Sequence, residues 1–128
     1  MKQTISLNRN EQFLQVYKKG KRTYHKNFTL HFLPNHMETN RLGIKAGKKL
    51  AKAVKRNRVR RLIKESYRLL EPNIAIGYDL IIVAKEGCLL ADSLSETKVA
   101  LYHLLKHARL LIKQDGASQE GPAREESQ

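Results

Sequence analysis

The side chains best able to do chemistry in this sequence are cations gathered in one run. Between Glu38 and Glu71 the only acid is Glu65, while the same interval holds 12 lysines and arginines. At this density such side chains bind phosphates, and an arginine can hold two phosphate oxygens at once. The run therefore indicates a surface for a polyanion.

We expect residues 48–70 to be helical for most of their length, because Pro72 ends the pattern. On a helix over residues 52–70 one stripe is apolar: Val59, Leu62, Ile63, Ser66 and Leu70. The opposite side carries Arg56, Asn57, Arg60, Arg61, Lys64 and Arg68.

A charged helix face is often only solvated, but such faces mix signs and form stabilising pairs four residues apart. Here like charges stand four apart at Lys52, Arg56, Arg60 and Lys64. Each such pair costs a few tenths of a kcal/mol. We therefore interpret this face as a site for phosphates. Asn57 either contacts a nucleotide there or fixes the local backbone.

Composition supports a polyanionic partner. The 128 residues carry a net charge of +13, and 41% of them are hydrophobic, which is enough for one small domain. Residues 1–114 carry +16, whereas residues 115–128 carry −3. We expect a folded domain at residues 1–113 and a disordered acidic and polar tail at 114–128. The single cysteine excludes an intrachain disulfide, and no run is long enough to span a membrane, so we expect a cytoplasmic protein.

The remaining elements frame this helix. A helix is expected from Arg9 to Lys19, capped by Asn8 and ended by Gly20. Two alternating strands, Asn27–Leu33 and Arg41–Ala46, are expected to pair with each other antiparallel. The apolar run in Tyr78–Lys85 is typical of a central strand covered on both faces. A last helix begins at Ser93, with the core face Leu101, Leu104, Leu105, Ala108, Leu111 and Ile112. The order predicts an α+β sandwich.

No catalytic constellation stands out. The acids of the folded part are scattered singly, so they do not form the carboxylate cluster that a metal-dependent nuclease needs. His103 and His107 are four apart but lack a third ligand, and we interpret them as a helix face. Cys88 is interpreted as structural. The glycines at positions 43 and 47 are spaced as in a glycine-rich loop, but the segment lacks the Lys-Ser/Thr ending of a phosphate-binding loop. We expect no catalytic residue and no metal ligand in this chain.

The basic run resembles the "RNR" signature of the bacterial ribonuclease P protein family. The matching residues are Lys48, Lys49, Ala53, Val54, Arg56, Asn57 and Arg61. Further similarity lies in Asn10–Gly20, Arg41–Ile44 and Tyr78–Ala84, so the resemblance covers roughly residues 7–113. Departures are Ala51 for a usual glycine, Arg60 for lysine and Lys64 for arginine.

The resemblance implies an αβββαβα sandwich with a mostly antiparallel four-stranded sheet and an unusual left-handed βαβ crossover, a fold like domain 2 of ribosomal protein S5. It also implies the non-catalytic protein subunit of an endoribonuclease that removes 5′ leaders from precursor tRNA, with Mg²⁺ required by the catalytic RNA. The RNA-binding residues would be Lys48, Lys49, Lys52, Arg56, Asn57, Arg60, Arg61 and Lys64. The leader cleft would include Phe13, Tyr17, Arg9 and Lys18.

Two other functions are compatible with the same basic helix. A general RNA-binding structural or ribosome-assembly protein could use the same basic helix. A DNA-binding regulator could insert the face of Arg56–Lys64 into a major groove. The expected strands around that helix do not fit a helix-turn-helix, so DNA is not an expected partner.

Among the expected leader-cleft residues, the aromatic ring of Phe13 suits either base stacking or core packing.

Overall fold

The computed structural model describes residues 3–112, and the tail expected at 114–128 lies outside them. Within the described part the chain forms five strands and three α-helices: β1 (Thr4–Ser6), α1 (Asn10–Lys19), β2 (Lys21–Tyr24), β3 (Phe28–Pro34), β4 (Asn40–Lys45), α2 (Ala53–Leu70), β5 (Tyr78–Ala84) and α3 (Leu94–His107). Two short 3-10 turns follow α2 and β5, at Glu71–Asn73 and Glu86–Leu89.

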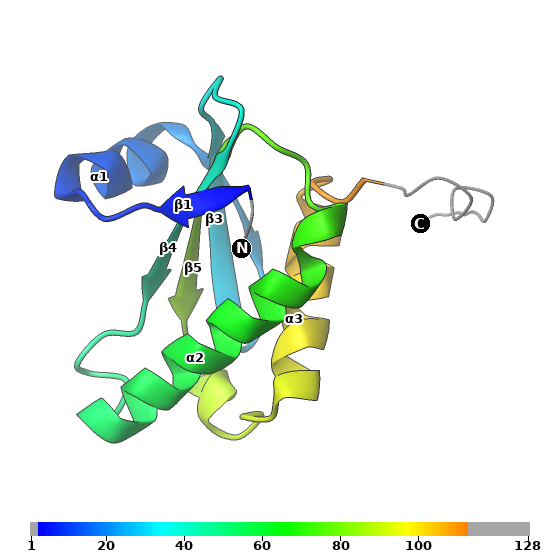
Figure 1. Cartoon of the computed structure of the whole chain (residues 1–128). Coiled ribbons are helices and arrows are strands. Elements are labelled where there is room, and N and C mark those ends of the chain that lie inside the picture. Colours follow the sequence, from blue (N-terminus) through cyan, green and yellow to red (C-terminus); the bar gives the residue numbers. More distant parts are fainter. Residues whose placement is uncertain (1–2, 113–128) are drawn as a thin grey trace.

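The strands form one mixed sheet in the order β1-β4-β5-β3-β2. β4 is parallel to β1 and β5, whereas β3 is antiparallel to β5 and β2. In Figure 1, β4 and β5 both run downwards with β5 to the right, and α2 climbs back in front of the sheet. This β4-α2-β5 crossover is left-handed, against the usual preference. The α+β class and the crossover are therefore confirmed.

Two details of the predicted sheet were wrong. It has five strands rather than four, and two of its four pairings are parallel, so it is not mostly antiparallel. The strands at residues 27–33 and 41–46 do not pair with each other, because β5 lies between β3 and β4. The parallel crossover through α2 allows this insertion, and a rule based on neighbours in sequence cannot foresee it.

Helices cover both faces of the sheet, which makes two cores. Successive residues of β5 point to opposite faces. Leu80 and Ile82 belong to the larger core under α2 and α3, and Ile81 belongs to the smaller core under α1. These residues are at most 3% exposed, so the expected central strand is confirmed.

The helix ends follow local rules, with small corrections. Arg9, not Asn8, is the N-cap of α1, and Gly20 ends the helix by donating its N–H to the Val16 carbonyl. Ser93 caps α3 as expected, since its Oγ accepts a hydrogen bond from the Glu96 N–H at 3.0 Å. α3 ends at His107, so residues 111 and 112 lie beyond it. There Leu111 forms an antiparallel bridge with Ile74.

Buried polar contacts fix the edge of the sheet against α2. Thr4 of β1 donates from Oγ1 to the Glu71 carboxylate at 2.6 Å and shares a hydrogen bond with the Tyr67 hydroxyl. Arg41 of β4 meets Asp79 of β5 in a two-point ion pair at 2.7 Å. These contacts hold β1 and β4 in place beside the basic helix. Among residues 3–112, no helix is long and apolar enough to cross a membrane.

Candidate nucleic-acid interface

The basic face of α2 is exposed because the opposite stripe is buried. Val59, Ile63, Ser66 and Leu70 are at most 6% exposed, as the helical spacing predicted, and Tyr67 joins them. On the other side Asn57, Arg60, Arg61 and Lys64 are exposed. The free energy of burying the apolar stripe therefore sets which way the cations point.

The cations of α2 fall into two groups according to whether an acid accompanies them. Arg58 lies 3.4 Å from Asp92, and Arg68 pairs with Glu65. Within residues 3–112 the salt bridges involve only Arg9, Arg41, Arg58 and Arg68 among the basic residues. The other lysines and arginines of α2 have no acidic partner in this part of the chain, so a bound polyanion could neutralise them. Arg68, which the helical sorting placed on the basic face, is occupied by a neighbour on its own helix.

Arg56 differs from its neighbours because it is partly buried. Its Nε is buried and has no hydrogen-bond partner in the described structure. A buried donor without a partner costs free energy. A phosphate or base oxygen at this position would remove that cost.

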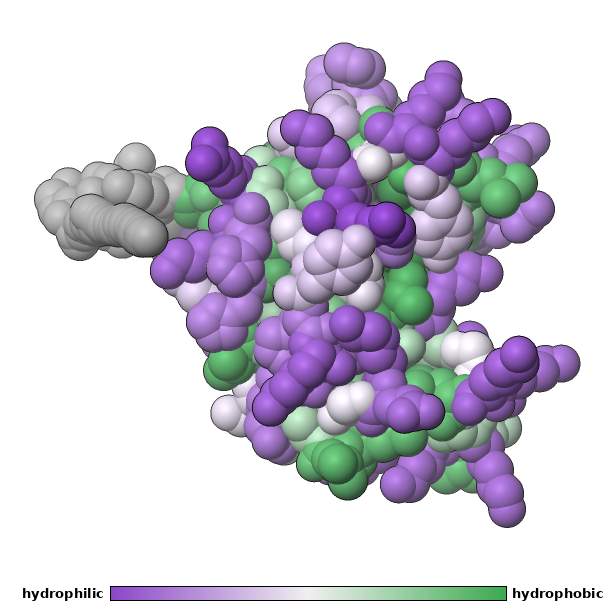
Figure 2. Space-filling view, turned by 180° about the vertical axis from the view of Figure 1, so that it is seen from behind, coloured by the Kyte–Doolittle hydropathy of each residue, from purple (hydrophilic) through white to green (hydrophobic). Residues whose placement is uncertain are grey.

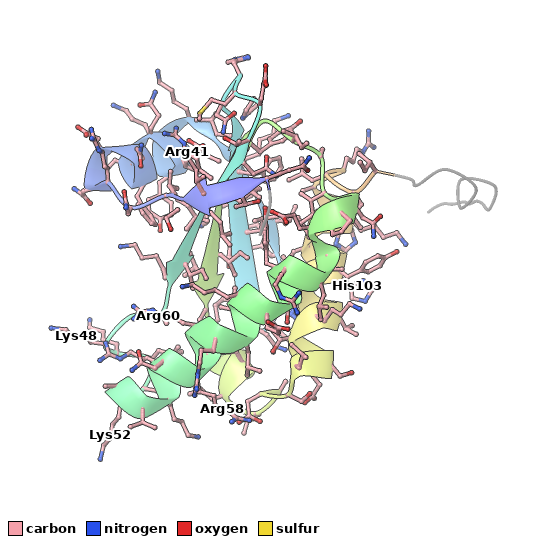
Figure 3. The ribbon with its side chains drawn as sticks, viewed as in Figure 1. Arg41, Lys48, Lys52, Arg58, Arg60 and His103 are labelled. Carbon is pink, nitrogen blue, oxygen red and sulfur yellow. The ribbon has the colours of Figure 1, made fainter. Side chains whose placement is uncertain are left out.

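The loop before α2 extends the basic face. Lys48, Lys49 and Lys52 are exposed, and Figure 3 shows Lys48 and Lys52 at one tip of the molecule, with Arg60 further along α2. The first turn of α2 contains no acid. Its free N–H groups therefore add a partial positive charge to that of the lysines. All eight predicted RNA-binding residues lie on this loop or on α2, at positions 48–64.

A groove joins this face to the other side of the sheet. It has a volume of about 670 Å³ and its cationic lining is Lys45, Arg60 and Lys64. Ile5 and Phe13 contribute apolar walls from β1 and α1. In Figure 2 the outline of the molecule is indented on the right, between the part that holds α1 above and the loop before α2 below. The groove connects two surfaces built by different elements.

On the α1 side the sheet is only half covered. In-register pairing places Lys45, Val83, Thr29 and Tyr24 in one row across β4, β5, β3 and β2. We call these four residues the open row. Facing residues of paired strands point to the same side, so the row crosses the α1 face of the sheet. Its ends, Lys45 and Tyr24, are exposed, whereas Thr29 between them is 8% exposed. Tyr17 of α1 borders the sheet beside this row.

The two predicted aromatic residues of α1 have different environments. Phe13 is 9% exposed, packs in the smaller core, and has the Lys45 ammonium 4.7 Å from its ring centroid. Tyr17 is 40% exposed and meets His31 edge-on at 4.8 Å between centroids. Phe13 is therefore mainly a core residue, whereas Tyr17 offers a ring to solvent. Burial raises the pKa of Tyr17.

Arg9 and Lys18 stand at opposite ends of α1, and both are exposed. Arg9 lies 3.8 Å from Glu11. The structure thus brings Phe13 and Tyr17 together, with ring centroids 6.4 Å apart, and leaves the two cations at the margins.

The leader-cleft residues expected from the sequence all lie on α1 or at its start, and none lies on the sheet. His31, Lys45 and Tyr24 are the side chains that sequence reasoning missed. His31 lies in the alternating strand expected at Asn27–Leu33, whereas β2, which carries Tyr24, was not recognised as a strand. Burial, and then the charge of Arg22, lower the pKa of His31.

Residues that suggested other chemistry are structural or isolated. Cys88 is buried, and burial raises the pKa of its thiol. His103 lies on the outer side of α3, on the far side of the molecule from Lys48 (Figure 3). Within residues 3–112, no three His, Cys, Asp or Glu side chains are grouped to hold a metal ion.

Comparison with known proteins decides between the RNA-binding classes. The family model for ribonuclease P matches residues 1–109. This chain belongs to the ribonuclease P protein family. The ribonuclease P protein component of Alkaliphilus oremlandii is 42% identical over 111 residues, covering 87% of this chain and 96% of the relative. That of Clostridium botulinum is 42% identical over 103 residues, covering 80% and 92%.

Solved structures agree with this assignment. The Staphylococcus aureus ribonuclease P protein aligns with a TM-score of 0.75 at 29% identity, covering 83% of this chain and 96% of that one. The Thermotoga maritima protein aligns at 0.73 and 28%, covering 80% and 96%. The expected family and fold are confirmed, and with them a role as a protein subunit of ribonuclease P in tRNA processing.

Proposed function

We propose that the chain binds ribonuclease P RNA through the loop at residues 46–52 and the basic face of α2, and holds the single-stranded 5′ leader of precursor tRNA along the open row. The RNA subunit would perform the hydrolysis. The protein would position the substrate and neutralise phosphates where two RNAs come together.

One observation carries this proposal: the groove between the two surfaces. Lys45 is both a wall of the groove and the end of the open row, and Arg60 and Lys64 line the groove from α2. An RNA bound on α2 would therefore lie next to a strand bound on the sheet. Because the two surfaces meet at the groove, the protein could hold the leader close to the RNA that performs the cleavage.

The open row and the side chains beside it suit unpaired nucleotides. An aromatic ring can stack on a base without selecting its sequence, and cations beside it hold the backbone. Tyr17 supplies such a ring, and His31 next to it offers a polar edge. Lys45 supplies the charge at one end.

The acids of the described chain support a non-catalytic role. Asp79, Asp92 and Glu65 each pair with an arginine, and Glu71 accepts a buried hydrogen bond from Thr4. Asp79 and Glu71 are buried, and these two carboxylates are engaged in holding the fold. Mg²⁺ bound to the RNA would supply the Lewis acid for hydrolysis. The cytoplasmic location stays a prediction.

The principal experiment is reconstitution. Full-length protein is added to bacterial ribonuclease P RNA at low magnesium, with precursor tRNA as substrate. We expect faster cleavage, because the protein neutralises phosphates that magnesium otherwise screens. Unchanged cleavage would favour the alternative, a general RNA-binding or ribosome-assembly protein.

Arg56→Ala tests the RNA face. Loss of one phosphate contact should weaken binding to the RNA subunit and reduce the slope of log affinity against log salt by about one. Lys98→Ala, which removes one exposed charge from α3, is the matched control and should leave the slope nearly unchanged. Equal effects of the two variants would mean that general electrostatics, not the α2 face, controls binding.

A further inference from the structure

Tyr24 is a highly exposed tyrosine at the edge of the sheet. It is 62% exposed, against 41% for Tyr102 and 40% for Tyr17. It ends β2, the outer strand of the sheet next to β3. Single exposed aromatics are common, so exposure alone does not make a site. Its neighbours are what distinguish it.

Two cations lie close to the Tyr24 ring. The Arg22 guanidinium carbon is 5.6 Å from the ring centroid, and the Lys85 ammonium is 6.0 Å away. Neither cation takes part in the salt bridges found within residues 3–112. An aromatic ring beside two unneutralised cations offers a stacking face together with charges for phosphate.

The surroundings strengthen the positive field. Burial, followed by the charges of His103, Lys26 and Lys85, lowers the pKa of His25, the residue after Tyr24. Lys26 in the turn after β2 and Lys85 at the end of β5 thus direct positive charge at the end of β2. No compensating acid is among these causes. The local charge is available to an anionic ligand.

Tyr24 is also in line with the surface that would hold the leader. It is opposite Thr29, which is opposite Val83, which is opposite Lys45. Three strand spacings separate β2 from β4, or roughly 14 Å. Lys45 lies at the groove shared with α2. The catalytic RNA would therefore lie at the Lys45 end of the open row, and Tyr24 is at the opposite end.

We propose that Tyr24, with Arg22 and Lys85, is a stacking site for an unpaired leader nucleotide that lies farther from the cleavage site than those beside Tyr17. This site rests on the proposed leader binding along the open row. Arg22 and Lys85 would hold the phosphates on either side of the stacked base. With this site, the subunit would contact a longer stretch of the leader.

The test uses the holoenzyme assembled from full-length protein and ribonuclease P RNA. Its affinity is measured for precursor tRNAs whose leaders are lengthened one nucleotide at a time. Wild type should gain affinity in a last step when the leader reaches Tyr24. Tyr24→Ala should lack that step, losing about fivefold or more for long leaders and nothing for short ones. Tyr24→Phe should keep it.

Tyr102→Ala is the matched control, since it removes another exposed tyrosine from a different surface. A fluorescent base analogue at the far leader position gives a direct readout: stacking on Tyr24 or on phenylalanine quenches it, and alanine does not. If Tyr24→Ala matches wild type at all lengths, this site is wrong although the leader dependence stands. If wild type itself shows no dependence on leader length, the leader surface is wrong as well.

Discussion

At the scale of single residues, the leader surface places a titratable group beside an aromatic one. His31 is half-buried between Tyr17 and Arg22 on the face of the sheet that α1 covers. Burial, then the charge of Arg22, disfavour its protonated form. The neutral imidazole can both donate and accept a hydrogen bond, which suits contact with a base edge.

His31 should make stability depend on pH. Its folded-state pKa lies below the ordinary value of 6.5, so the unfolded chain takes up the proton more readily. Its contribution to stability is present above that ordinary value and is lost as pH falls below it. We expect wild type to lose more unfolding free energy than His31→Phe between about pH 7.5 and about pH 5.5.

Denaturant titrations at the two pH values measure this difference. Because His25 has a lowered pKa too, both proteins should be destabilised by acid, and only the difference reports on His31. Equal losses in the two proteins would contradict the assignment.

At the scale of elements, the distance between α1 and the sheet depends on a glycine. A Cβ at Gly43 would lie 2.5 Å from Cζ of Phe13 and 2.8 Å from its Cε2. The ring therefore lies directly on β4, and any side chain at this position would lift α1. Tyr17 would move with it.

Gly43→Ala should lower the unfolding free energy by about 1–3 kcal/mol, the usual effect of overpacking. It should also weaken leader binding, because α1 would shift away from the open row. Gly47→Ala is the control, since a Cβ there meets nothing within 4 Å. Unfolding in denaturant, followed by circular dichroism, measures both variants. Similar losses for the two would mean that Phe13 adjusts without strain.

The elements also show which parts of the fold the sequence reveals. The long amphipathic helices were predicted because their periodicity is strong, and β5 was predicted because its apolar run is unbroken. β1 has only three residues, too few to show a period. β2 reads Lys-Arg-Thr-Tyr, a basic segment without the alternation of a half-buried strand. An edge strand with polar side chains on both faces leaves almost no signal in the sequence.

At the scale of the whole molecule, repulsion among like charges is the main electrostatic fact. The chain has 25 lysines and arginines against 12 acids. This excess destabilises the free, compact protein and favours association with RNA. The same property therefore has opposite consequences for the protein alone and for its complex.

Salt should act in opposite directions on these two states. Raising sodium chloride from about 0.05 M to about 0.5 M should increase the Tm of the free protein, because it screens self-repulsion. The same change should weaken binding to the RNA subunit. Thermal unfolding and filter binding test the pair. A Tm that falls with salt would show that ion pairs outweigh repulsion in the free protein.

The candidate site could be predicted only in part for a related reason. The α2 face is local in sequence, so helical geometry alone located Arg56 and Arg60. The open row comes from four strands whose register depends on the whole fold. Its members, such as Lys45 and Tyr24, share no pattern along the chain. Sequence reasoning finds surfaces built on one element and misses those assembled from several.

The central place of β5 has a consequence for synthesis on the ribosome. β3 and β4 both pair with β5 and not with each other, yet β5 is made last of the five strands. Until residue 84 has left the exit tunnel, these two strands lack their shared partner. The basic segment of α2 emerges earlier, before β5 has joined these strands into the sheet that the apolar stripe of α2 covers. The nascent chain therefore passes through a stage in which the cations of α2 are exposed to RNA while the open row has not yet formed.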